Sequence, residues 1–85
     1  MLIKGRVQGV GFRVNTRRQA RKLGLTGWVR NLANGDVKVV AEGEQSDLKQ
    51  LVSWAQTGPS MAHVNDVKEN WKESNDEFST FSIKY

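Results

Sequence analysis

The chain has no cysteine and only one histidine and one proline, and these scarcities exclude several classes of protein. Without cysteine there is no disulfide framework, no thiol nucleophile and no cysteine-ligated zinc. His63 has no neighbouring set of ligands, so we expect a surface residue at a strand end and no metal site. No apolar run approaches the ~18–20 residues that span a bilayer, and the first residues lead directly into Lys4. These features predict a cytoplasmic protein with no membrane partner.

The 85 residues are enough for one small domain, covering residues 1–85, and their charge is unevenly distributed. Residues 1–41 carry nine Lys or Arg against one acid, whereas residues 42–85 carry four against eight. A positive field of this kind attracts nucleic acid, anionic lipid or a small anionic substrate. The basic run at Arg17, Arg18, Arg21 and Lys22 is also typical of a solvated helix face.

Residues 5–13 form a glycine-spaced loop that ends in an arginine, Gly-Arg-Val-Gln-Gly-Val-Gly-Phe-Arg. Glycines let the backbone bend so that several N–H groups face one point, which is typical of an anion-binding nest. Arg13 adds a guanidinium that matches the oxygens of a phosphate. The loop lacks the Gly-Lys-Ser/Thr of a nucleotide-binding P-loop and the third glycine of a dinucleotide site. A glycine-rich turn between a strand and a helix is the alternative from these residues alone.

Apolar periodicity predicts the elements around this loop. A short strand precedes it, and a helix follows it from Phe12 to a stop at Gly24. Asn34-Gly35 marks a hairpin turn between two strands. Ser46 is expected to cap a second helix. The further strands are expected at residues 26–32, 37–41, 62–72 and 81–85, with Trp28, Trp54 and Trp71 as packing residues.

This order is β-α-β-β-α-β with one additional strand at the end. It predicts an α+β, ferredoxin-like sandwich, with a five-stranded antiparallel sheet that carries both helices on one face.

Two blocks of the sequence, Gly5-Arg-Val-Gln-Gly-Val-Gly-Phe-Arg13 and Leu23-Gly-Leu-Thr-Gly-Trp-Val-Arg-Asn31, closely resemble the acylphosphatase family. The resemblance extends through Gly35 and Val37 and implies the same sandwich fold. Members of the family have several more residues in the first strand than the four that precede Gly5 here, so we expect a short first strand. The family hydrolyses carboxyl-phosphate anhydrides.

The resemblance also implies roles for individual residues. Arg13 corresponds to the phosphate-binding arginine, and Asn31 to the asparagine that positions the attacking water. Backbone N–H groups of Gln8, Gly9, Val10 and Gly11 would complete the phosphate cradle. No metal or cofactor is implied, and the substrate phosphate itself can accept the proton. We expect a monomer that acts on a small acyl phosphate, releases inorganic phosphate and binds no nucleic acid.

Two other functions stay open from the sequence. RNA-recognition domains share the order of elements, but their aromatic motif is absent here and the aromatic residues are scattered. A non-catalytic module that binds acyl or carbamoyl phosphate, like the domain at the start of hydrogenase-maturation proteins, is the second alternative.

Overall fold

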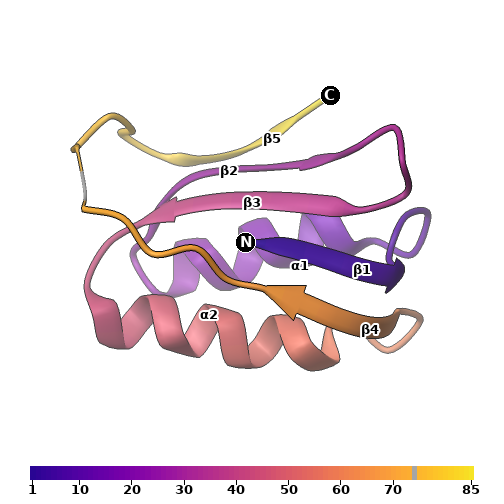
Figure 1. Cartoon of the computed structure of the whole chain (residues 1–85). Coiled ribbons are helices and arrows are strands. Elements are labelled where there is room, and N and C mark those ends of the chain that lie inside the picture. The colour runs from indigo at the N-terminus through magenta and orange to yellow at the C-terminus, as the bar shows by residue number, and fades with distance from the viewer. Residues whose placement is uncertain (74) are drawn as a thin grey trace.

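The computed structural model describes residues 1–73 and 75–85 and contains two helices and five strands (Figure 1). The elements follow the predicted order. Their bounds are β1 Leu2–Arg6, α1 Phe12–Lys22, β2 Thr26–Asn31, β3 Val37–Glu42, α2 Gln45–Thr57, β4 His63–Lys68 and β5 Phe81–Lys84.

The strands form one sheet in the order β4-β1-β3-β2-β5 (Figure 1). β1 pairs antiparallel with β3 and β4, and β2 pairs antiparallel with β3. β5, however, lies parallel to β2, so the prediction of a wholly antiparallel sheet is wrong. The chain leaves β4 at one edge of the sheet and crosses to the other edge, where β5 enters alongside β2 in the same direction.

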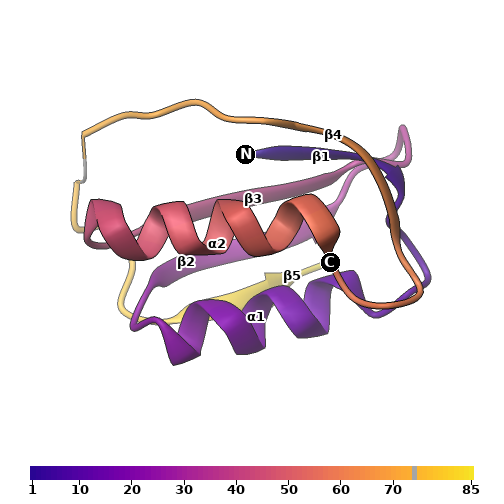
Figure 2. The ribbon, with the colours of Figure 1, turned by 90° about the horizontal axis from the view of Figure 1, so that it is seen from below.

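Both helices cover one face of the sheet, as expected, and the core lies between the two layers (Figure 2). Phe12, the first residue of α1, is buried and packs against Trp54 of α2 with ring centroids 5.5 Å apart. This contact anchors the start of α1, and with it the end of the glycine loop. Within the described residues, no helix is long and apolar enough to cross a membrane.

Three local expectations change in the structure, and one is confirmed. Helix α2 begins at Gln45 with Glu44 as its N-cap, so Ser46 lies inside the helix rather than capping it. Strand β4 ends at Lys68 instead of residue 72. Trp71 beyond it is 46% exposed and hydrogen-bonds Glu69, so it is not a core packing residue. His63 is exposed at the start of β4, as predicted.

Candidate active site

The glycine loop leads directly into α1 with its N–H groups available. Gly9 and Gly11 have φ angles of 74° and 76°, a left-handed conformation that favours glycine, and they flank Val10. Among the described residues, no protein acceptor receives a hydrogen bond from the N–H groups of residues 8–12. The first turn of α1 contains no acidic residue, so its positive dipole end is not neutralised. The loop and helix start can therefore hold an anion.

Arg13 extends from the first turn of α1 at this point. It is half-buried, and its guanidinium lies 5.0 Å from the centroid of the Tyr85 ring. No carboxylate of the described residues forms an ion pair with it. Its charge and donors are thus available to a ligand.

Asn31 is the last residue of β2, opposite Val37 of β3. Its Oδ1 atom is buried and has no hydrogen-bond partner within the described part of the chain. A buried acceptor without a partner is costly, so this oxygen is suited to receive a donor from a ligand or a water molecule. Arg30, the preceding residue, is exposed, as the alternation of a strand requires.

A small hollow of about 70 Å³ brings the two predicted catalytic residues together. Arg13 and Asn31 both line it, as do Gly9 and Gly11 of the loop. Gln8 and Val10, whose N–H groups were also predicted to bind phosphate, do not line this hollow. The remaining lining residues are Val7, Phe12 and Val14.

The Gln8 side chain has a structural contact that the sequence did not reveal. Its Nε2 donates to the carbonyl oxygens of Leu32 at 2.7 Å and Asp36 at 2.9 Å. These two carbonyls belong to the turn that joins β2 to β3, directly after Asn31. Gln8 therefore links the glycine loop to the turn. No local sequence motif predicts this contact, because the two segments are distant in the sequence.

Asp36 of the turn between β2 and β3 is buried and forms an ion pair with Lys4 of β1 at 2.7 Å. Its position after Gly35 in a turn explained why aspartate is tolerated but not what it contacts. The signal that could have found the pair is the register between β1 and β3, which the sequence alone does not define.

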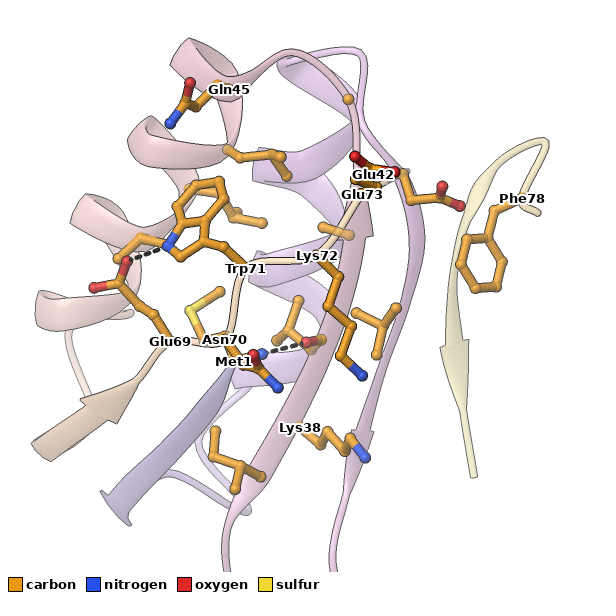
Figure 3. Close-up of a pocket in the computed structure, with 18 of the residues that line it drawn as sticks. Met1, Lys38, Glu42, Gln45, Glu69, Asn70, Trp71, Lys72, Glu73 and Phe78 are labelled. Atoms are coloured by element: carbon orange, nitrogen blue, oxygen red, sulfur yellow. Dashed lines mark hydrogen bonds between the residues drawn. The ribbon is translucent and has the colours of Figure 1, made fainter. Parts of the chain in front are cut away.

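A much larger cavity, about 780 Å³, lies at the opposite end of the sheet (Figure 3). It is bounded by β3, α2 and the segment that follows β4, including Trp71 and Glu73. β1 begins beside Val39, where the Met1 ammonium donates to the Val39 carbonyl at 2.8 Å. Ala41 lies two residues further along β3, so its N–H and carbonyl point toward the same edge of β3 as those of Val39. Among the described residues, no backbone group pairs with them on that edge. Neither Arg13 nor Asn31 lines this cavity.

A five-stranded sheet with both helices on one face, and an open anion nest where the first helix begins, define a class of small sandwich proteins that hold an oxyanion. Within that class, residues 1–83 match the family model described as acylphosphatase. The chain belongs to the acylphosphatase family.

Individual relatives agree with this assignment. An acylphosphatase of Roseiflexus sp. is 48% identical over 83 residues, which cover 98% of this chain and 89% of the relative. The crystal structure of acylphosphatase from Bacillus subtilis is similar with a TM-score of 0.95 and 37% identity, covering 99% of this chain and 93% of that one. The structure of full-length HypF in its phosphate- and nucleotide-bound form is similar with a TM-score of 0.88 and 30% identity, but this chain covers only 11% of it.

Proposed function

We propose that Arg13 binds the phosphate of an acyl phosphate and that Asn31 positions the water that attacks it. The protein is an acid-anhydride hydrolase that cleaves the carboxyl-phosphate bond, the activity of the family to which it belongs. Backbone N–H groups of Gln8, Gly9, Val10 and Gly11 complete the phosphate cradle in this proposal. Phosphoryl transfer depends mainly on positioning and on charge stabilisation, which these groups supply.

One observation carries the proposal. The Oδ1 atom of Asn31 is a buried acceptor without a partner among the described residues, and Asn31 and Arg13 line the same hollow. An amide oxygen cannot serve as a base at neutral pH, but it can accept a hydrogen bond from water and orient the attacking lone pair. Arg13 and the loop bind the group under attack, so nucleophile and electrophile meet in one small space.

The reaction balances without a group beyond those named. The water oxygen forms a bond to phosphorus as the bond from phosphorus to the carboxyl oxygen breaks, and the carboxylate leaves with the electron pair. The proton of the water passes to an oxygen of the phosphate. Arg13 and the backbone N–H groups stabilise the negative charge on the phosphoryl oxygens throughout. The products are a carboxylate and inorganic phosphate.

We also propose a location, an oligomeric state and partners for the enzyme. We expect a cytoplasmic monomer that acts on a small molecule, with no nucleic acid or membrane as partner. The support for a monomer is that Arg13, Asn31 and the glycine loop, all from one chain, surround the hollow. Sedimentation of the chain at catalytic concentration tests this part, and activity that depends on dimer formation would contradict it.

The direct experiment measures hydrolysis of benzoyl phosphate, with a metal chelator present, by the unmodified chain and by Arg13→Ala and Asn31→Ala. Arg18→Ala on the exposed side of α1 and Asn65→Ala at an exposed position of β4 are the matched controls. Inorganic phosphate is titrated as a competitive inhibitor in every variant. We expect Asn31→Ala to lose turnover and keep its phosphate affinity, because the contact with water matters mainly in the transition state. Arg13→Ala should lose both.

Two results would contradict the proposal. Loss of phosphate affinity in Asn31→Ala as severe as in Arg13→Ala would remove the distinction between their roles. A folded chain that binds phosphate but does not turn over benzoyl phosphate would favour the non-catalytic binding module.

A further inference from the structure

We propose that Asp36, held by Lys4, is a positioning residue that fixes Asn31 relative to the phosphate-binding loop. The inference rests on the proposed role of Asn31 and adds a specific function to two residues of this chain. Lys4 and Asp36 do not line the small hollow, and their side chains contact each other at the turn between β2 and β3, so we expect them to act on the reaction through that turn.

Asp36 is a charged residue in a place where charge is costly. It is 8% exposed, and a buried carboxylate is stable only when it is paired and hydrogen-bonded. Lys4 Nζ donates to Asp36 Oδ2 at 2.7 Å, and Asn34 Nδ2 donates to the same oxygen at 3.3 Å. The Asp36 N–H in turn donates to Asn34 Oδ1 at 3.0 Å. These contacts specify one conformation of the turn.

The ion pair continues the sheet where its backbone ladder ends. β1 and β3 are paired at Leu2 with Lys38 and at Ile3 with Val37. The next pair in the same register is Lys4 with Asp36, one residue before β3 begins. The side chains thus bind the turn to β1 at the position where backbone pairing no longer does.

The backbone of Asp36 completes the connection to the loop. Its carbonyl accepts from the Leu32 N–H at 2.8 Å and from Gln8 Nε2 at 2.9 Å. Gln8 Nε2 also donates to the Leu32 carbonyl at 2.7 Å, so one amide group holds both sides of the turn. Gln8 precedes Gly9 in the loop, and Leu32 follows Asn31, so the Asp36 end of the turn and the two halves of the site form one hydrogen-bonded unit.

The expected effect is selective. Loss of the ion pair releases the Asp36 end of the turn from β1 and shifts Asn31. Arg13 should shift less, because Phe12 beside it anchors the start of α1 against Trp54. A misplacement of about 1 Å in a reacting group costs about 100-fold in rate, so a partial release should lower kcat by about 10-fold. The affinity for inorganic phosphate should stay within about 2-fold, because phosphate binding does not use Asn31 in this scheme.

The test compares Asp36→Asn, Lys4→Met and the double variant for kcat, KM and inhibition by inorganic phosphate. The two residues act as a unit, so the double variant should be no slower than the slower single variant. The matched control is Asp66→Asn. Asp66 is the β4 neighbour of Lys4 on its other side, is exposed, and forms no ion pair with Lys4. The control should leave kcat unchanged.

A second measurement separates positioning from general destabilisation. The side-chain amide signal of Asn31 in a ¹H–¹⁵N spectrum should move in Asp36→Asn and Lys4→Met but not in Asp66→Asn. The reversed pair, Lys4→Asp with Asp36→Lys, should restore part of the lost kcat. Lower melting temperatures with unchanged kcat and an unmoved Asn31 signal would overturn the inference, as would equal losses of kcat and phosphate affinity.

The failure of this inference is distinguishable from the failure of the proposed function. If the unmodified chain binds phosphate without hydrolysing benzoyl phosphate, the function is wrong, and the Asn31 signal alone then decides on positioning. If the unmodified chain is active but Asp36→Asn and Lys4→Met change neither kcat nor the Asn31 signal, the positioning role is overturned and the proposed function stands.

Discussion

The two ends of the sheet are organised differently. At the site end, Gln8 and the Lys4–Asp36 pair join the loop, the turn and β1 through side-chain hydrogen bonds. At the opposite end, β1 begins beside Val39, so the last residues of β3 have no pairing with β1. A cavity of about 780 Å³ lies beside them, and residues 69–73 and 75–80 form no helix or strand. At the site end, side-chain hydrogen bonds thus link the segments that carry Arg13 and Asn31, whereas at the far end they hold residues 75–77 to β3.

The far end should influence stability without influencing the reaction, and Leu51→Ala tests this with the largest expected effect. Leu51 of α2 is buried in the core and lines the large cavity. Its truncation should lower the free energy of unfolding by about 2–5 kcal/mol, because lost burial and a new void add together. Urea unfolding gives this value, and kcat measured well below the melting temperature should be unchanged. Exposed Lys49→Ala on the same helix is the control. A parallel loss of kcat would show that the two ends are coupled.

Arg13→Lys should have the reverse effect at the site end. Lysine keeps the positive charge but loses the planar fork that matches phosphate oxygens. We expect kcat/KM for benzoyl phosphate to fall about 10- to 100-fold, equivalent to about 1.4–2.7 kcal/mol, with the unfolding free energy unchanged. Arg18→Lys on the exposed side of α1 should be silent in both assays. Full activity of Arg13→Lys would mean that charge alone, not the geometry of the guanidinium, is required.

Glu42→Gln tests how the far end is held together. The Glu42 carboxylate accepts from the backbone N–H groups of Asn75, Asp76 and Glu77 at 2.9, 3.0 and 3.1 Å. An uncharged amide accepts more weakly, so the variant should be less stable by about 1 kcal/mol. Limited proteolysis should then cleave the segment after β4 faster, while kcat stays the same. Glu73→Gln in the same segment is the control, and equal cleavage in both variants would exclude a special role for Glu42.

The features that the sequence predicted correctly are those that depend on short, continuous segments of the chain. The loop 5–13 and Asn31 were found because each lies in a short motif, and the hairpin at Asn34-Gly35 brings β3 alongside β2. Arg13 and Asn31 both line the small hollow, and the roles assigned to them stay predictions. The βαββαβ order was also correct, because it follows from apolar periodicity along single segments.

The direction of β5 and the side-chain contacts that were missed depend on pairs of distant segments. Phe81 and Ile83 alternate with polar residues in the same way whether β5 runs parallel or antiparallel to β2. The contacts of Gln8 and the Lys4–Asp36 pair depend on the register between elements, and neither residue belongs to a local pattern that reveals its partner. Trp71 lies beyond the end of β4 at Lys68, outside the sheet, and its side chain is half exposed.

The smallest expected effect concerns the Met1 ammonium at the edge of the large cavity. Burial lowers the pKa of this amine below its ordinary value of 8.0, Lys38 lowers it further, and Glu69 opposes the shift. Between the lowered pKa and 8.0 the unfolded chain binds more protons than the folded chain, so the free energy of unfolding rises with pH across this window and levels off above it. Urea unfolding from pH 6 to 9 should show this rise, and N-terminal acetylation should remove it. Since the amine lies at the far end, kcat should not follow the same profile, and a shared profile would contradict the independence of the two ends.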